Sequence, residues 1–247
     1  MKLFIDTANL VDIEMALKWG FVQGITTNPS LLAKEPKSEF EIHIKKIVEL
    51  IRKYKNGVHL SVEVFSRDPS EIMAQARRFR DMLHYEQLSI KIQIGLNELE
   101  VIRKLREDCF SVNCTCCMDT LQAVLAAASG ARYVSLFYGR IRDGGTAGLN
   151  QDHDKKRAEA MKSGILDDKD FDPAAVINMT RTLLDKSYPE VEIIAGSIRK
   201  ATDIRDAGLA GAHIVTVPPK FFPQMAEHFK TEEVVEEFLA NFRKWLT

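Results

Sequence analysis

Short apolar runs alternate with longer amphipathic stretches from one end of the chain to the other. Eight of these runs are four to seven residues long, a length typical of buried strands. They span residues 3–6, 24–27, 59–65, 88–93, 110–116, 132–137, 191–195 and 213–217. The stretches that follow them have apolar residues at helical spacing. This alternation predicts parallel strands joined by helical crossovers.

Helices are predicted after the strands, and one more helix is predicted at the C-terminal end. They span residues 9–19, 39–53, 68–83, 97–107, 119–129, 173–186, 200–207 and 218–229, followed by 232–246. Eight strand–helix units in 247 residues predict an α/β fold, a single (β/α)8 TIM barrel with an extra C-terminal helix. A doubly wound open sheet is the alternative, but its glycine-rich nucleotide turn has no counterpart here. We expect one barrel domain over residues 1–230 and the additional helix over 231–247.

Composition mainly excludes certain partners. The formal net charge of −1 gives no sign of a nucleic-acid partner. No apolar run approaches the ~20 residues of a membrane-spanning helix, and no signal peptide precedes the first strand, so we expect a cytoplasmic protein without a membrane partner. The four cysteines, Cys109, Cys114, Cys116 and Cys117, lack CxxC spacing and a nearby histidine. We predict reduced thiols and no metal site, with Cys114 and Cys116 on one face of their strand.

Lys91 lies in the strand 88–93, between Ile90 and Ile92. Side chains alternate between the two faces of a strand, so Lys91 points away from both isoleucines. In a barrel the outward face meets the helices and is apolar, and the lysine would then point inward. A buried amine costs free energy and needs a functional reason. A lysine that faces solvent is the alternative and is the usual arrangement.

The same alternation brings polar residues from six strands to one end of the predicted barrel. Reactive side chains of such barrels lie at the carboxyl ends of the strands. Apart from Lys91, the residues concerned are Asp6, Glu63, Asn113, Thr115, Ser135 and Ser197, with Phe137 on the same face as Ser135. Some have simpler interpretations, because Asp6 could cap the next helix and Glu63 could pair with a surface lysine. The agreement of six strands favours a common cavity.

This set of residues fits Schiff-base chemistry. An amine in a poorly solvated pocket favours its neutral form, which can attack a ketone and form an iminium ion. Glu63 and Thr115 could hold a water that shuttles protons in this step. Asp6 is the candidate base for a substrate hydroxyl while a carbon–carbon bond breaks. The remaining hydroxyl groups could be bound by Asn28, Asn113 and Ser135.

Two arginines follow the ends of neighbouring predicted strands. Arg140 follows the sixth strand, and Arg199 follows the seventh, two residues after Ser197. Two guanidinium groups and a hydroxyl suit a phosphate monoester, although two solvated surface arginines are the alternative. The polar segment 142–172 is long for a connection in a barrel, and we expect it to be either functional or partly helical and mobile.

Five motifs, in this order, resemble those of the transaldolase family. They are Phe4 to Ala8, Gly24 to Leu31, Lys91-Ile92, Ser135 to Ile141 and Ala195 to Arg199. The resemblance implies a (β/α)8 barrel with a Schiff-base lysine at Lys91 and candidate substrate-binding residues at Thr27 and Asn28. It implies transfer of a dihydroxyacetone unit from a ketose phosphate to an aldose phosphate, with no metal and no cofactor. In the small subfamily of this length, the last helix packs on a neighbouring subunit, so we expect a homo-oligomer.

The same subfamily contains fructose-6-phosphate aldolases, and four positions favour a transaldolase. Glu63, Thr115, Phe137 and Arg199 are similar to the transaldolase residues, whereas the aldolases tend to have glutamine for Glu63 and tyrosine for Phe137. An aldolase that releases free dihydroxyacetone and a non-catalytic sugar-phosphate-binding barrel are the alternatives. Gln93 departs from the resemblance, because proline is usual two residues after the lysine. Its amide could reach the pocket and change the sugar specificity.

Overall fold

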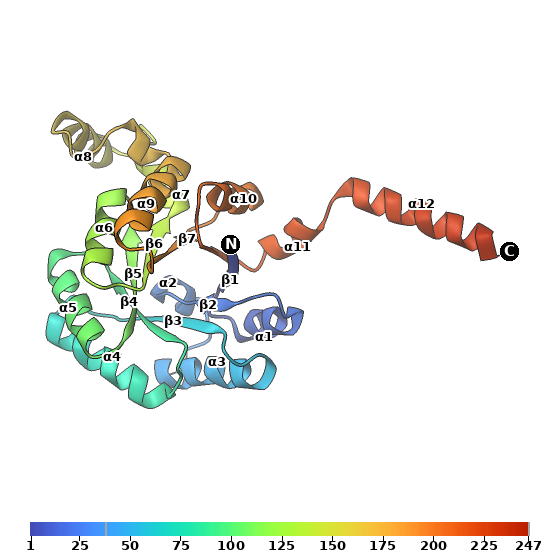
Figure 1. Ribbon diagram of the computed structural model, residues 1–247, viewed down its shortest axis with the longest axis horizontal. Helices are drawn as coiled ribbons and strands as arrows, with labels where there is room; N and C mark the ends of the chain where they lie inside the picture. The colour runs from blue at the N-terminus through green and yellow to red at the C-terminus, as the bar shows by residue number, and fades with distance from the viewer. Residues whose placement is uncertain (38, 247) are drawn as a thin grey trace.

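A closed barrel of parallel strands forms the centre of the molecule (Figure 1), a computed structural model that describes residues 1–37 and 39–246. The strands are β1 Lys2–Asp6, β2 Gly24–Thr26, β3 His59–Glu63, β4 Leu88–Gln93, β5 Ser111–Cys117, β6 Tyr133–Phe137, β7 Glu192–Gly196 and β8 Ile214–Val217. Each strand pairs in parallel with the next, and β8 closes the barrel against β1. This confirms the predicted barrel and excludes the open sheet.

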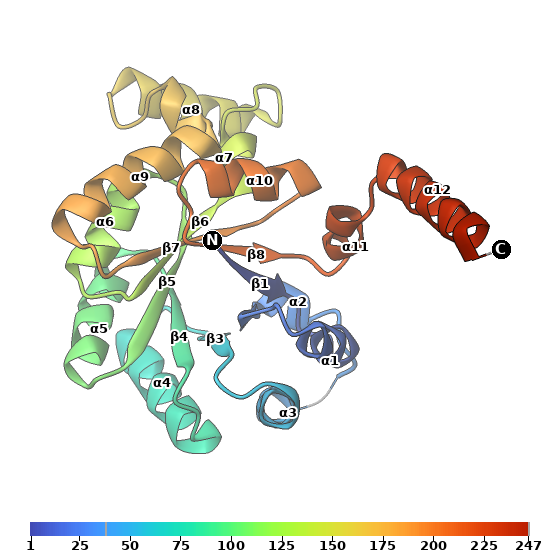
Figure 2. The same cartoon turned by 45° about the vertical axis from the view of Figure 1, so that its right-hand side comes forward.

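The helices surround the barrel, except for the last one, which stands away from it in both views (Figures 1 and 2). They are α1 Leu10–Trp19, α2 Pro29–Leu32, α3 Phe40–Tyr54, α4 Pro69–Leu83, α5 Leu96–Glu107, α6 Thr120–Ala128, α7 Tyr138–Gly144, α8 Gln151–Lys162, the 3-10 helix η1 Asp168–Phe171, α9 Pro173–Ser187, α10 Ala201–Leu209, α11 Phe221–Ala226 and α12 Phe229–Leu246. The predicted helices are present with shifted ends.

Local side-chain hydrogen bonds explain where several helices begin. The carboxylates of Asp68 and Asp119 accept from the backbone N–H groups of Glu71 and Gln122, at the starts of α4 and α6. The predicted start of the helix 97–107 is one residue late, because α5 begins at Leu96 after Gly95. The polar segment 142–172 contains α8 and η1, so it is partly helical, which agrees with part of one of the two predicted alternatives.

Apolar residues fill part of the barrel interior and cover its outer face. Phe4, Ile194 and Ile214 form a small buried cluster inside the barrel, with Tyr133 packed against it. The outward strand positions are apolar and fully or almost fully buried beneath the helices, for example Ile5, Ile25, Leu60, Ile90 and Val112. This division is the one expected for a barrel whose site lies at the carboxyl ends of its strands.

One irregularity changes the direction of side chains at the end of β5. The pairing of β5 with β6 shifts register between Cys114 and Cys117, and Cys116 has a φ angle of 63°. A bulge of this kind reverses the alternation of side chains. The prediction that Cys114 and Cys116 share a face is therefore wrong: Cys114 is buried in the core, whereas Cys116 lines a cavity.

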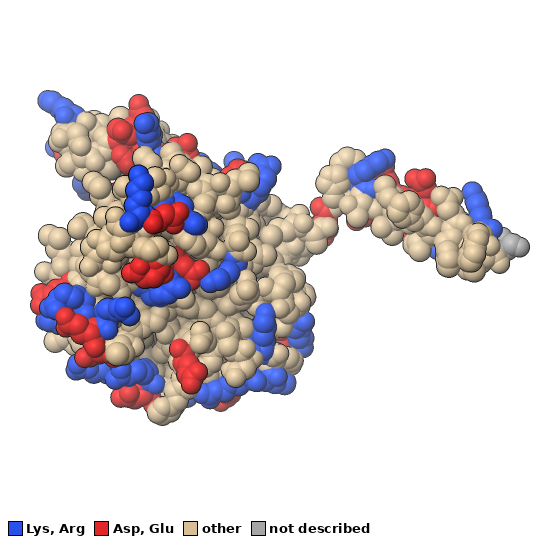
Figure 3. Space-filling model, viewed as in Figure 1, with Lys and Arg blue, Asp and Glu red and all other residues tan. Residues whose placement is uncertain are grey.

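The four cysteines are free thiols, as predicted. Within residues 1–37 and 39–246, no group of three or more His, Cys, Asp or Glu side chains could hold a metal ion. No helix in this described part of the chain is both long enough and apolar enough to cross a membrane. Basic and acidic side chains are interspersed over the face of the barrel seen in Figure 3.

Candidate active site

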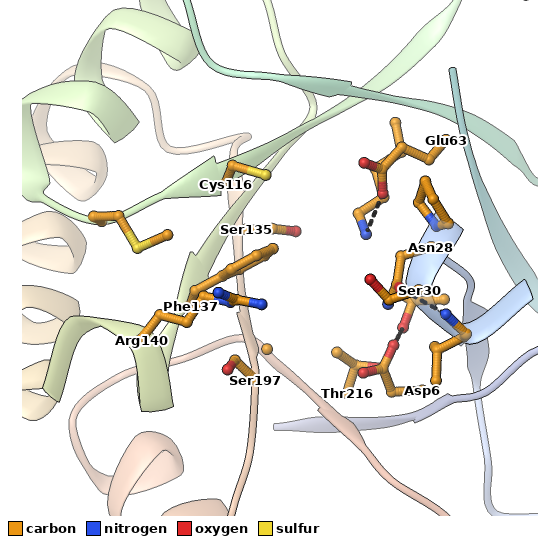
Figure 4. A pocket seen from close by; sticks show the side chains of 16 residues that line it. Asp6, Asn28, Ser30, Glu63, Cys116, Ser135, Phe137, Arg140, Ser197 and Thr216 are labelled. Carbon is orange, nitrogen blue, oxygen red and sulfur yellow. Dashed lines mark hydrogen bonds and ion pairs between the residues drawn. The ribbon is translucent and has the colours of Figure 1, made fainter. Parts of the chain in front are cut away.

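A cavity of about 450 Å³ opens at the carboxyl ends of the barrel strands. Figure 4 shows Asp6, Asn28 and Glu63 on one side of this space and Ser135 and Arg140 on the other. The residues that line it are Asp6, Thr26, Asn28, Pro29, Ser30, Leu31, Glu63, Lys91, Cys116, Met118, Ser135, Phe137, Arg140, Gly196, Ser197 and Thr216. Most of the predicted site residues are therefore brought together.

Lys91 is buried inside the barrel, and only 6% of its side chain is exposed. Glu63 and Lys91 are register partners on the adjacent strands β3 and β4, and their inward side chains therefore lie side by side. Lys91 Nζ is 3.0 Å from Glu63 Oε2 and donates a hydrogen bond to the Thr27 carbonyl oxygen at 3.2 Å. The partner of Glu63 is thus this buried amine, and the surface-lysine interpretation is wrong.

Asp6 is the second carboxylate of the cavity. Thr26 Oγ1 donates a hydrogen bond to Asp6 Oδ1 at 2.9 Å and lies 2.5 Å from Thr216 Oγ1. Burial raises the pKa of the Asp6 carboxyl, against the opposing effects of the Lys91 charge and the Thr26 hydrogen bond. The alternative role of Asp6 as a helix cap is wrong, because the Asn9 side chain caps α1.

Asn113 and Thr115 lie behind the cavity wall, whereas Ser135 reaches the cavity itself. Ser135 Oγ donates to Asn113 Oδ1 at 2.7 Å, and Asn113 Nδ2 donates to Ser61 Oγ at 3.1 Å. The hydroxyl of Thr115 is fully buried, and the described residues offer it no hydrogen-bond partner. A buried hydroxyl without a partner is costly unless a water or ligand satisfies it.

Thr27 and Asn28 contribute to the site in different ways. Thr27 Oγ1 donates to the Ser61 carbonyl oxygen at 3.2 Å, so Thr27 presents its backbone carbonyl to Lys91 instead of its hydroxyl. Asn28 lines the cavity, and its Oδ1 accepts from the backbone N–H of Leu31 at the start of α2. The cap fixes the orientation of the Asn28 amide toward the cavity.

The residues predicted to bind a phosphate are only partly assembled. Arg140 and Ser197 line the cavity. Arg199 instead makes two hydrogen bonds to the Asp143 carboxylate, with Arg199 Nη1 2.7 Å from Asp143 Oδ1. Ser197 has a φ angle of 58°, a strained conformation for a residue other than glycine, and its carbonyl accepts from the backbone N–H of Gly139.

Several cavity residues were not predicted. Thr26 and Thr216 bind each other beside Asp6, and the inward direction of Thr216 could have been found from its apolar neighbours Val215 and Val217. Cys116 and Met118 line the cavity because of the β5 bulge. Burial raises the pKa of the Cys116 thiol, which makes it a neutral wall residue.

Gln93 is not among the residues that line this cavity. Its amide Nε2 donates to the Ser66 carbonyl oxygen at 2.9 Å and lies 3.3 Å from the buried Glu98 carboxylate. The prediction that this amide reaches the pocket is therefore wrong. Gln93 instead links the end of β4 to the loop after β3 and to the first turn of α5.

Known proteins resemble this chain over almost its whole length. A family profile described as transaldolase/fructose-6-phosphate aldolase matches residues 3–246. A "probable transaldolase" of Symbiobacterium thermophilum is 33% identical over 242 residues, covering 98% of this chain and 97% of that protein. A "probable transaldolase" of Caldicellulosiruptor saccharolyticus is 35% identical over 246 residues, with 99% and 98% covered. A "probable transaldolase" of Thermoplasma acidophilum is 31% identical over 246 residues, with 99% and 96% covered.

Proposed function

The chain belongs to the transaldolase/fructose-6-phosphate aldolase family, and from this we propose that it is a transaldolase that forms a Schiff base on Lys91. It transfers a dihydroxyacetone unit from a ketose phosphate to an aldose phosphate. The observation that carries the proposal is the buried Lys91 amine, 3.0 Å from the Glu63 carboxylate in a cavity that also contains Asp6. A barrel that only bound sugar phosphates would gain little from a buried amine.

Glu63 and Thr115 assist the proton transfers that form the Schiff base. The Glu63 carboxylate is close enough to take a proton from the Lys91 ammonium group, which frees the amine to attack the substrate ketone. The unpartnered Thr115 hydroxyl supports the proposal of a water near these residues. That water carries the proton that the departing carbinolamine hydroxyl needs.

Asp6 is the base for cleavage of the carbon–carbon bond. Its carboxylate removes the proton of the substrate hydroxyl next to that bond, and the iminium ion takes up the electron pair. Asn28 and Ser135 hold the hydroxyl groups of the dihydroxyacetone unit, and Asn113, which was expected to do the same, instead supports Ser135 from behind the cavity wall. Arg140 and Ser197 bind the phosphate, and Arg199 joins them when it leaves Asp143.

The proposal is tested by trapping the covalent intermediate. The protein is treated with borohydride in the presence of fructose 6-phosphate, and the adduct is located by mass spectrometry. We expect a reduced adduct on Lys91, because borohydride converts the iminium ion to a stable amine. No adduct under turnover conditions would refute the Schiff base and leave the non-catalytic barrel.

Phe137→Tyr should shift the reaction from transfer toward release of free dihydroxyacetone. Phe137 lines the cavity and has no hydroxyl to help water protonate the enamine. One added hydrogen bond of about 1.4 kcal/mol should raise the ratio of release to transfer about tenfold. Product ratios are measured with and without an acceptor aldose phosphate. Phe171→Tyr, outside the cavity, is the control, and an unchanged ratio in Phe137→Tyr would contradict the choice of transaldolase over aldolase.

We also propose that α12 packs on a second copy of the chain in a homo-oligomer. No residue of α12 is buried, and its exposed apolar side chains recur at helical spacing, namely Val235, Phe238, Leu239, Phe242, Trp245 and Leu246.

The free thiols favour a reducing compartment, and we propose a cytoplasmic location.

Phe238→Glu combined with Phe242→Glu should dissociate the oligomer into monomers. Two carboxylates would be desolvated in the apolar stripe of α12, at a cost of several kcal/mol. The molar mass is measured by light scattering coupled to size exclusion. Glu237→Gln on the same helix is the control. A monomer in the unmodified protein, or an unchanged mass in the double variant, would contradict the proposal.

A further inference from the structure

His59 is a buried titratable residue for which the proposed reaction has no use. It begins β3 at the amino-terminal end of the barrel and is 7% exposed. Its ring stacks on Phe4 at 5.1 Å between centroids and meets the ring of Tyr133 edge-on at 4.7 Å. Burial lowers the pKa of His59 to about 4, so the imidazole is neutral at neutral pH.

Hydrogen bonds connect His59 to the cavity through the interior of the barrel. His59 Nε2 is 2.8 Å from Ser61 Oγ, which accepts from Asn113 Nδ2 at 3.1 Å. Asn113 Oδ1 in turn accepts from Ser135 Oγ at 2.7 Å, and Ser135 lines the cavity. We call these four residues the His59–Ser135 chain. The two middle members, Ser61 and Asn113, are fully buried, so no bulk water can replace a partner that they lose.

In one arrangement of the protons, every hydrogen bond of the His59–Ser135 chain points from Ser135 toward His59. With the Ser61 oxygen accepting from Asn113, the neutral His59 tautomer whose Nε2 carries no proton gives the single Ser61 hydroxyl proton an acceptor, and we assign this tautomer to His59. Ser135 likewise uses its proton on Asn113. The Ser135 oxygen therefore has lone pairs, and no proton, to offer to a ligand in the cavity. Such an oxygen prefers a ligand hydroxyl that donates.

We propose that His59 is a positioning residue that fixes, through Ser61 and Asn113, the hydrogen-bond direction that Ser135 presents to the hydroxyl groups of the ketose donor. The proposal rests on the proposed function, since it concerns the same cavity. His59 itself touches no substrate. Removing its acceptor nitrogen leaves the Ser61 proton without a partner and allows the Asn113 amide and the Ser135 hydroxyl to reorient.

The test compares variants that interrupt the chain with a matched variant beside it. Ser61→Ala and His59→Phe interrupt the chain, and phenylalanine keeps an aromatic ring against Phe4. Ser89 is the register partner of Ser61 on β4, and among the described residues its hydroxyl bonds to Ser111 alone, at 2.7 Å. Ser89→Ala thus removes a part-buried hydrogen bond in the same layer of the barrel and leaves the His59–Ser135 chain intact.

We expect Ser61→Ala and His59→Phe to raise the KM of the ketose phosphate about tenfold, the effect of one buried hydrogen bond. The Lys91 adduct should still form at saturating donor. Ser89→Ala should leave KM within about twofold, and His59→Gln, which restores an acceptor, should recover most of the loss. The double variant of His59 and Ser61 should behave like either single variant, because both act through one chain.

Two results would overturn the proposal. One is a rise of KM in Ser89→Ala as large as that in Ser61→Ala and His59→Phe. Such a rise would mean that KM follows the general stability of the barrel, which thermal unfolding of the same variants measures in parallel. The other is a KM of the ketose phosphate that is no lower in His59→Gln than in His59→Phe. If the unmodified protein forms no adduct, the proposed function fails separately. The His59 proposal is then decided by the Kd of fructose 6-phosphate in calorimetric titrations of the same variants.

Discussion

Lys91→Met is expected to lower kcat by ~10⁴-fold or more and to leave no borohydride-stable adduct on the chain. Methionine keeps the length and apolar stem of lysine but has no nucleophilic nitrogen. No other amine could take over the attack, because Lys91 is the only lysine that lines the cavity in the described part of the chain. Single-turnover kinetics and mass spectrometry measure the two effects.

The same substitution should also destabilise the fold by about 3 kcal/mol, because it leaves the Glu63 carboxylate buried without its ion-pair partner. Adding Glu63→Gln should restore much of this stability without restoring activity. Lys186→Met, on the exposed end of α9, is the control for the loss of one lysine. An active Lys91→Met protein would refute the covalent mechanism, whatever its stability.

Asp6→Asn should lower kcat by ~10³-fold and yet should not weaken the fold at neutral pH. Asparagine still accepts the hydrogen bond from Thr26 but cannot remove a proton. Burial raises the pKa of Asp6, so the folded state binds this proton more tightly than the unfolded chain does. Ionised Asp6 therefore makes folding less favourable as the pH rises through its pKa, and an uncharged replacement avoids that cost.

The pH profile gives a second measurement for Asp6. As a base, Asp6 must be ionised, so activity should fall as the pH decreases through its pKa, which lies above the ordinary value of 3.8. Asp6→Asn should lack this acid limb in its residual activity. Chemical denaturation at pH 7 measures the stability. A variant that keeps the acid limb, or that unfolds at clearly lower denaturant, would contradict this account of Asp6.

Alternation along single strands accounts for what the sequence could predict of the site. Lys91 lies between two isoleucines, and Asn113 lies between Val112 and Cys114, so their inward direction follows from local pattern once a barrel is assumed. The barrel itself follows from the repetition of strand and helix. The pairing of Glu63 with Lys91 then depends only on which residues are register partners on neighbouring strands.

The parts that could not be predicted depend on contacts between distant segments or on broken alternation. Cys116 enters the cavity only because β5 contains a bulge, which no local pattern of small apolar residues reveals. The strand β2 has three residues, too few to show which way Thr26 points. The link from His59 to Ser135 requires the registers of three strand pairs at once. Register is a tertiary property.

The contact between Arg199 and Asp143 determines which anions can bind to the Arg199 guanidinium group. A ligand can bind the Arg199 guanidinium group only if it binds more strongly than the Asp143 carboxylate, which already accepts two hydrogen bonds from it. A doubly charged phosphate can do so, whereas a neutral sugar or a singly charged carboxylic acid has no such advantage. We infer that Asp143 competes with the substrate phosphate for Arg199, so that this contact favours phosphorylated sugars over free ones.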